Sequence, residues 1–207
     1  MNKNFVTFLV VVFVVAVILG VKVYSEAQRA NPADFKSLRV KGEEGAPIQI
    51  VEFIDFQCPA CAVGAKFLNK YMKDNPGRVR LELKYFPLNM HKHAYLAAQY
   101  AECAGRQQKF WPFHDLMVER QDRWKSLANV RLAFDAMIEE VGVDAEKLAA
   151  CLDRDSVKQT IEADKEEGKA AGVKSTPSYF VNGTLVVGFR NLAAEINKLV
   201  QVNSIEN

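Results

Sequence analysis

The sequence has no marked excess of either charge. Its 27 Lys and Arg residues are balanced by 25 Asp and Glu residues over 207 positions, for a formal net charge of +2. Without a basic stripe or an acidic tail, the chain lacks the signature of a nucleic-acid-binding protein or of a cation buffer. It also has no internal repeat and no low-complexity tract. With 49% hydrophobic and 25% charged residues, we expect one globular domain rather than a disordered chain.

Cysteine is also scarce. Only Cys58 and Cys61 form a C-x-x-C pair, so the second pair that would complete a four-cysteine zinc site is missing. The one candidate for completing a metal site is His91-x-His93. We therefore expect a dithiol that opens and closes a disulfide, with a metal half-site and an inert structural disulfide as the alternatives.

The chain has one long apolar run, over residues 5–21 behind Lys3. Its length falls between a signal-peptide core of about 7 to 15 residues and the roughly 20 residues needed to cross a bilayer. We expect residues 1–24 to be either a signal peptide, cleaved at Ser25-Glu26-Ala27, or an uncleaved anchor in the cytoplasmic membrane. Both interpretations place the rest of the chain in the periplasm or another extracytoplasmic space, where disulfides persist.

The folded domain is predicted to follow a linker. Residues 25–46 are polar and interrupted by glycine and proline, which predicts such a linker. The nearly continuous apolar run Ile48–Ile54 predicts a strand that is buried on both faces. A helix is expected to begin around Pro59, because proline fits the first turn of a helix, where its missing N–H costs nothing. Val79–Phe86 alternates as a second strand.

The middle of the chain carries helical periodicity without a strand signal. We predict helices over about residues 91–104, 110–120, 130–141, 145–152 and 156–171. The Asp164-Lys165-Glu166-Glu167 run of the last one is expected to face solvent. Two short strands then follow around Asn182-Gly183, a strong hairpin signal, and Asn191 is expected to cap a final helix. The predicted α/β domain therefore consists of two halves, residues 47–90 and 171–207, separated by an all-helical insertion over residues 91–170.

Cys58 stands where a predicted strand ends and a predicted helix begins. The unsatisfied N–H groups of a first helical turn stabilise an anion, so we expect the pKa of the Cys58 thiol to be lowered. Cys61 should face back toward the same turn as the more buried, resolving thiol. Because Pro59 and Ala60 add no charge and no hydrogen-bond donor, we expect an intermediate reduction potential.

Two motifs together resemble the DsbA-like thiol:disulfide oxidoreductases. The resemblance extends over roughly residues 46–203, and it implies a thioredoxin-like fold with an inserted helical domain. It further implies that the dithiol introduces disulfide bonds into unfolded exported proteins without another cofactor, and that a membrane partner of the DsbB type re-oxidises it. The motifs are Glu52-Phe53-x-Asp55-Phe56-x-Cys58-Pro59-x-Cys61 and Ser175-Thr176-Pro177-Ser178-Tyr179-Phe180-Val181-Asn182-Gly183.

The resemblance also implies roles for residues around the dithiol. Pro177 is expected to be cis and to lie against the dithiol, so that the backbone of Thr176 can pair with an extended substrate; an ordinary turn proline is the alternative. Glu52 matches a buried acid of the family, and Lys84 matches its partner on the next strand. Such a pair would carry the proton that Cys61 loses, whereas a solvated pair at the sheet edge would be inert.

Two departures from the family pattern leave the direction of electron flow open. The best-known oxidases carry His at the position of Ala60 and Val at the position of Thr176, and Thr is found there in isomerases and other branches. A disulfide isomerase or reductase therefore stays an alternative, as does a copper- or zinc-binding thiol protein.

Cys103 and Cys151 remain outside the dithiol. In an exported domain we expect them to form a structural disulfide that ties the helical insertion together. Two separately buried thiols are the alternative, since cysteine packs as a small hydrophobic residue.

Overall fold

A computed structural model of the chain describes residues 12–20 and 37–203, which fall in two units, residues 1–34 and 35–207. In the first unit residues 12–20 are helical. The other residues of the predicted apolar run, 5–11 and 21, lie outside the described residues. Within the described ranges, no helix combines the length and the hydropathy needed to cross a bilayer. The predicted signal or anchor therefore stays a prediction.

The second unit is built on a five-stranded sheet in the order β1-β3-β2-β4-β5. Its central strand, β2, runs parallel to β3 and antiparallel to β4, while β1 and β5 pair antiparallel at the two edges. Four of the five strands lie where the sequence predicts them, and the structure adds β1. The strands are β1 (Val40–Lys41), β2 (Ile48–Ile54), β3 (Val79–Tyr85), β4 (Ser178–Val181) and β5 (Thr184–Val187).

The additional strand corrects the predicted linker over residues 25–46. A 3-10 turn, η1 (Ser37–Arg39), leads into β1, which pairs with β3. Arg39 is only 2% exposed and forms an ion pair with Asp164. The folded domain therefore includes residues 37–46. A two-residue strand has too few positions to show periodicity, which is why the sequence pattern did not indicate it.

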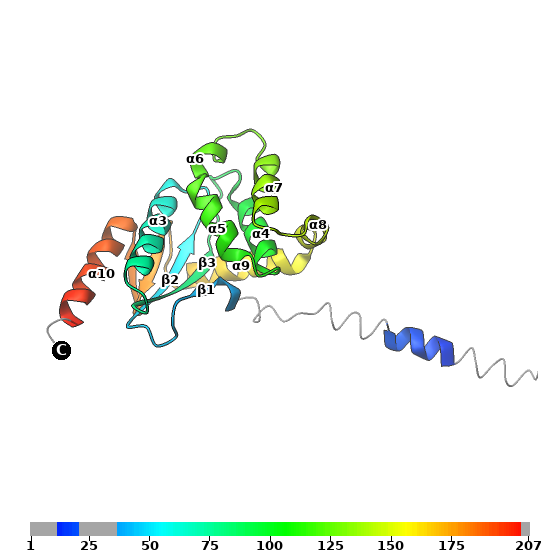
Figure 1. The fold of residues 1–207 in the computed structure, drawn as a ribbon, viewed down its shortest axis with the longest axis horizontal. Coiled ribbons are helices and arrows are strands. Elements are labelled where there is room, and N and C mark those ends of the chain that lie inside the picture. The colour runs from blue at the N-terminus through cyan, green and yellow to red at the C-terminus, as the bar shows by residue number, and fades with distance from the viewer. Residues whose placement is uncertain (1–11, 21–36, 204–207) are drawn as a thin grey trace, which may run out of the picture. The chain divides into compact units, whose positions relative to one another are not determined.

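Helices cover both faces of the sheet (Figure 1). One face carries α3 (Pro59–Asp74) and α10 (Phe189–Asn203), which share a buried apolar cluster with the strands. Side chains alternate along a strand, so Phe53 of β2 points to the face opposite that of Ile48 and Ile50. The helix α9 (Asp155–Ala170) packs close to Phe53 on this opposite face. A Cβ added at Gly168 of α9 would lie 2.7 Å from the Phe53 ring. Glycine at this position therefore allows the helix to approach the sheet closely.

The predicted all-helical insertion, residues 91–170, ends with α9, which packs on the sheet. The helices between β3 and α9, called the insertion below, gather beside the sheet in Figure 1. Cys103 and Cys151 form a disulfide that joins its first and last helices, with 5.8 Å between their Cα atoms. The final helix α10 begins at Phe189, two residues before the predicted cap Asn191. The insertion consists of α4 (Ala94–Gly105), α5 (Phe110–Glu119), α6 (Gln121–Trp124), α7 (Arg131–Glu140) and α8 (Ala145–Leu152).

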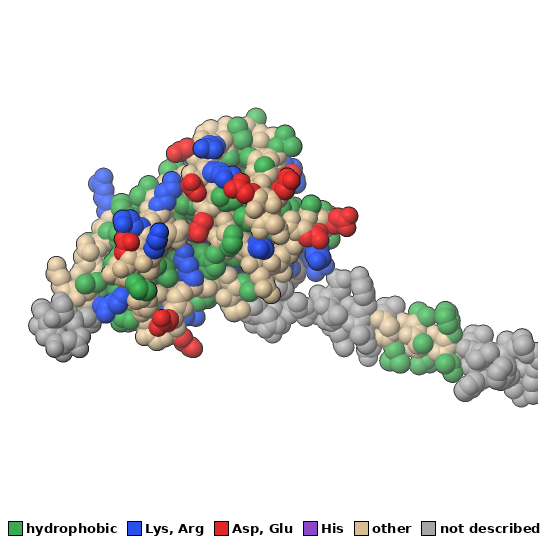
Figure 2. Space-filling view, viewed as in Figure 1, with side chains coloured by type: hydrophobic (Ala, Val, Ile, Leu, Met, Phe, Trp, Pro, Cys, Tyr) green, Lys and Arg blue, Asp and Glu red, His purple; other side chains and the backbone are tan. Residues whose placement is uncertain are grey.

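Side chains of both charges are mixed over the face seen in Figure 2, but some charged groups are buried. Asp164 is 1% exposed, accepts a hydrogen bond from Arg39, and also accepts one from the Tyr85 backbone N–H at 3.0 Å. Glu102 accepts from the Tyr85 hydroxyl at 3.2 Å and from Arg106 at 3.1 Å. The prediction that Asp164 faces solvent was therefore wrong. This ion cluster connects η1, the sheet, α4 and α9.

Candidate active site

The segment from Cys58 to Cys61 joins β2 to α3. Cys58 is the N-cap residue, with extended backbone angles (φ −72°, ψ 120°), and Pro59 occupies the first helical turn. The N–H groups of Cys61 and Ala62 donate to the Cys58 carbonyl at 3.1 and 3.2 Å. Both thiols are free; Cys58 is 7% exposed, and Cys61 is fully buried. Cys58 is therefore the thiol that a protein substrate can reach.

Asp55 orders the loop that leads to the dithiol. Its carboxylate accepts hydrogen bonds from the backbone N–H of Gln57 at 2.7 Å and of Leu88 at 2.9 Å, and it contacts His91 Nδ1 at 2.7 Å. Its carbonyl accepts from the Cys58 N–H at 3.0 Å. This one buried side chain holds together the ends of β2 and β3, and so it fixes the approach to Cys58.

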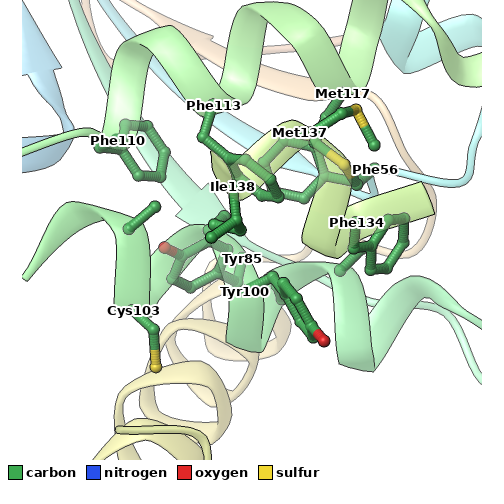
Figure 3. Packing of buried hydrophobic residues seen from close by; sticks show 14 of the residues in the cluster. Phe56, Tyr85, Tyr100, Cys103, Phe110, Phe113, Met117, Phe134, Met137 and Ile138 are labelled. Carbon is green, nitrogen blue, oxygen red and sulfur yellow. The ribbon is translucent and has the colours of Figure 1, made fainter. Parts of the chain in front are cut away.

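The helical insertion supports the same loop from the other side. Gln121 of α6 donates from Nε2 to the carbonyls of Phe56, at 2.7 Å, and Cys58, at 2.9 Å. Figure 3 shows Phe56 among the buried side chains of the insertion, with Phe113 and Met117 of α5. Sequence reasoning did not identify Gln121, because a single amide in a four-residue helix carries no motif. The dithiol is therefore positioned by the insertion as well as by the sheet.

The second motif reaches the dithiol from more than a hundred residues away. The Thr176–Pro177 peptide bond is cis. The Cys58 thiol donates to the Thr176 carbonyl with 3.5 Å between Sγ and O. The structure therefore places Thr176 against the reactive thiol, as the resemblance implies.

The pKa values of the two thiols are shifted in opposite directions. The pKa of Cys58 is lowered from 9.0 to about 6, mainly by a hydrogen bond from the Cys61 thiol, while burial opposes this shift. The backbone amides of Cys61 and Ala60 and the side chain of Thr176 lower it further. Burial raises the pKa of Cys61 well above 9.0, and its contact with Cys58 raises it further. The expected thiolate at Cys58 therefore arises from the neighbouring thiol first and from the helix amides second.

The structure does not bring Glu52 and Lys84 together, so the predicted pair was wrong. In the register of β2 and β3, Lys84 lies beside Phe53, whose side chain points away from that of Glu52. Lys84 instead pairs with Glu167 of α9 and, at 3.6 Å, with Glu82. Lys84 therefore contributes to packing of α9 on the far face of the sheet.

Glu52 itself lies on the same face as α3, below the dithiol. It is fully buried, and neither of its carboxylate oxygens has a hydrogen-bond partner among the residues that the structure describes. Burial raises its pKa from 4.5 to about 8, and the charge of Lys41 opposes this effect. Lys41 of β1, placed over the Trp111 ring at 4.1 Å, is thus a cation that acts on Glu52, which Lys84 does not.

The histidines considered as metal ligands are engaged elsewhere. His91 contacts Asp55, and His93 Nε2 lies 2.8 Å from the Leu127 carbonyl. Across residues 12–20 and 37–203, no three His, Cys, Asp or Glu side chains are grouped so as to hold a metal ion. In this part of the chain the dithiol has no third ligand.

Comparisons with known proteins agree with this geometry. The family profile described as thioredoxin matches residues 36–201. Disulfide bond formation protein D of Bacillus subtilis is 26% identical over 170 residues, which cover 80% of this chain and 76% of that protein. The crystal structure of oxidised BdbD from Bacillus subtilis has a TM-score of 0.66 at 24% identity, and the match covers 79% of this chain and 92% of that one.

Another group of relatives is much longer than this chain. Na(+)/H(+) antiporter NhaA 3 of Salinispora tropica is 30% identical over 164 residues, which cover 79% of this chain but 24% of the antiporter. The chain thus spans about a quarter of the length of these relatives. Taken together, the comparisons confirm the predicted thioredoxin-like fold and the resemblance to DsbA-like proteins.

Proposed function

Because the chain belongs to the thioredoxin family, we propose that it is a DsbA-like thiol:disulfide oxidoreductase that introduces disulfide bonds into exported proteins. One observation carries the proposal: Cys58, with a pKa lowered to about 6, is the more exposed thiol and lies against the Thr176 carbonyl. Its neighbour Cys61 is fully buried and keeps its proton. An accessible thiolate beside a protected thiol is the arrangement that disulfide exchange requires.

The reaction follows from this asymmetry. In the oxidised protein a substrate thiolate attacks Cys58 Sγ, the bond to Cys61 breaks, and Cys61 leaves as a thiolate that takes up a proton. A second substrate thiolate then attacks the substrate sulfur of the mixed disulfide and releases Cys58 as a thiolate. Two electrons pass from the substrate to the protein, which ends with Cys58 and Cys61 reduced. A low pKa makes Cys58 a good leaving group in the second step.

The same low pKa favours the oxidising direction. A stabilised Cys58 thiolate lowers the free energy of the reduced protein, and so the disulfide accepts electrons more readily. This argument supports an oxidase over a reductase, even though Thr176 precedes the cis proline.

Substrate binding is expected along the Thr176 backbone. When Cys58 is reduced and protonated, the Thr176 carbonyl accepts from its thiol. Once Cys58 is bonded to a substrate sulfur, that carbonyl can accept an N–H from the extended substrate segment instead. Backbone pairing of this kind selects unfolded chains without selecting their sequence.

Location and partner follow from the same chemistry. The Cys103–Cys151 disulfide persists in an oxidising compartment, so we place the domain outside the cytoplasm. Residues 5–21 would direct its export, either as a cleaved signal or as an anchor in the cytoplasmic membrane. Re-oxidation of the dithiol would come from a membrane partner of the DsbB type, and the redox disulfide itself is the only cofactor that the reaction needs.

The test is the reduction potential of the Cys58/Cys61 couple. Equilibrating the protein in glutathione buffers, followed by alkylation and mass analysis of the Cys58 peptide, distinguishes this couple from Cys103–Cys151. We expect a potential between about −180 and −120 mV, the range of disulfide isomerase and DsbA. The wild type should also oxidise a reduced secreted protein, whereas Cys58→Ser should not, and Cys61→Ser should accumulate mixed disulfides.

Two results would count against the proposal in different ways. A potential near −270 mV, the value of thioredoxin, would reject the oxidase and favour the reductase. A wild type that forms no mixed disulfide with any substrate would reject disulfide exchange altogether.

A further inference from the structure

Tyr179 reaches the space below the dithiol from β4. It is the antiparallel partner of Glu52 in β2, and it is fully buried. Its hydroxyl is directed at α3, because a Cβ added at Gly64 would lie 2.1 Å from the hydroxyl oxygen and 3.4 Å from the ring carbon Cζ. Gly64 follows Cys61 by three residues, which is about one helical turn. The hydroxyl therefore occupies the space that a side chain at position 64 would need.

Tyr179 and Glu52 share a second property. Apart from the interaction between these two groups, neither the Tyr179 hydroxyl nor either Glu52 carboxylate oxygen has a hydrogen-bond partner within the described part of the chain. Buried polar groups without partners are rare in proteins, because each loses its hydration without compensation. Directly opposed residues of antiparallel strands have Cβ atoms about 5 Å apart, so each of these two side chains is within reach of the other. A hydroxyl donor and a carboxylate acceptor are also chemically complementary.

Electrostatic coupling links the pair to the dithiol. The titratable groups that act on Glu52 are Lys41 from β1 and Tyr179 from β4, and both lower its pKa against the larger effect of burial. Glu52 in turn helps to raise the pKa of Cys61 in α3, after burial and the contact with Cys58. Burial, and then Glu52, Cys61 and Cys58, raise the pKa of Tyr179 itself.

Groups of the neighbouring helix α5 act on Lys41, which in turn acts on Glu52. Burial lowers the pKa of Lys41, and Asp115 opposes this effect. Burial also lowers the pKa of His114, which contacts Asp115 at 2.8 Å, and Lys41 lowers it further.

We propose that Tyr179 is a positioning residue for disulfide exchange: its hydroxyl donates to the Glu52 carboxylate and so sets the pH at which Glu52 accepts the proton of Cys61. The inference rests on the proposed function and names a residue that this function does not require. Gly64 is part of the same arrangement, because the absence of a side chain at this position leaves room for the Tyr179 hydroxyl.

The step concerned closes the dithiol. In a mixed disulfide on Cys58, the Cys61 thiol gives its proton to Glu52, and the Cys61 thiolate attacks Cys58 Sγ. The Cys58–Cys61 bond forms, the bond to the outer sulfur breaks, and the departing thiolate takes a proton from water. The outer disulfide is the oxidant, so no further electron acceptor is needed. Tyr179 keeps its own proton throughout.

The variant Tyr179→Phe tests the proposal by removing one oxygen atom. Glutathione is attached to Cys58 of the wild type and the variant at about pH 4, and its release by Cys61 is followed after jumps to higher pH. Losing a hydrogen bond to a charged group should move the midpoint of the rate profile up by about one pH unit. Alkylation of reduced Cys58 should keep its own midpoint near pH 6 in both proteins, because Tyr179 is not among the groups that set it.

A second variant tests the position of the Tyr179 hydroxyl independently of proton transfer. Gly64→Ala should lower the melting temperature of the wild type, because the new methyl group would collide with the Tyr179 hydroxyl. In the Tyr179→Phe background the nearest atom would be the ring carbon at 3.4 Å, so the same change should cost much less. Equal losses in both backgrounds would show that the hydroxyl does not lie over Gly64 and would overturn the proposal.

The kinetic outcomes separate the two levels of the argument. If the wild type releases glutathione and the Tyr179→Phe profile superimposes on it, the role of Tyr179 is refuted while the proposed function stands. If the wild type releases no glutathione at any pH, the proposed function and this inference both fail.

Discussion

The stability of the Glu52→Gln variant, relative to that of the wild type, should increase as the pH rises. Burial raises the pKa of Glu52 from 4.5 to about 8. Between these values the unfolded chain has already lost a proton that the folded protein still holds, so stability falls with increasing pH. At about 1.36 kcal/mol per pH unit, the cost reaches about 3 kcal/mol at pH 7 and about 5 kcal/mol above pH 8. Glutamine does not titrate and avoids this cost.

The pH dependence, rather than the value at one pH, is the decisive quantity. The buried glutamine amide adds its own desolvation penalty, but that penalty is independent of pH. Urea unfolding of the oxidised proteins, in which the cysteines do not titrate, should be compared at about pH 5 and pH 7.5. The stability difference between Glu52→Gln and the wild type should grow by about 3 kcal/mol over this interval.

A matched control is available on α9. Glu166 is exposed and pairs with Lys169 on the surface, so Glu166→Gln should change stability by less than about 1 kcal/mol at either pH. If the Glu52→Gln difference is as flat as that of the control, Glu52 ionises normally in the folded protein. The account of Glu52 as an acid whose pKa is raised by burial below the dithiol would then be refuted.

Two further predictions follow from the buried charges and the thiols. Asp164→Asn leaves Arg39 buried without its main partner, and it should cost about 3 kcal/mol or more in urea unfolding at pH 7; a loss below about 1 kcal/mol would contradict the ion cluster. In reduced protein, the rate of Cys58 alkylation should rise through a midpoint near pH 6 while Cys61 stays unreactive below pH 9, and a Cys58 midpoint near 9 would show an ordinary thiol.

The features that the sequence predicted correctly depend on local signals. The apolar run Ile48–Ile54 is a buried strand because it lies at the centre of the sheet. The helix after it begins at Pro59 because proline suits a first turn. The hairpin turns at Asn182-Gly183 because both residues adopt positive φ, of 46° and 83°. In each case the residues that decide the structure are neighbours in the chain.

The errors concern contacts between distant segments. Lys84 was matched to Glu52 by its position on the next strand, yet the side chains of a strand alternate between faces, and a register difference of one residue reverses the outcome. In the observed register Lys84 is paired with Phe53 and so faces α9. Sequence separation alone does not set this register. Lys41 was missed for a related reason, since its strand is recognisable only through pairing with β3.

Three features around the dithiol each weaken the fold by themselves. Glycine inside a helix, as at Gly64, costs about 0.5–1 kcal/mol relative to alanine, and Glu52 and Tyr179 bury polar groups that have no partner besides each other among the described residues. Gly168 is also a glycine inside a helix, but Phe53 lies where its side chain would be, so close packing alone explains it. Packing does not explain Gly64, because the space beside it is filled by the Tyr179 hydroxyl, and a phenylalanine at position 179 would leave that space empty. Local rules that fail together at one place indicate a function there, and proton transfer to and from Cys61 is a function that uses all three residues.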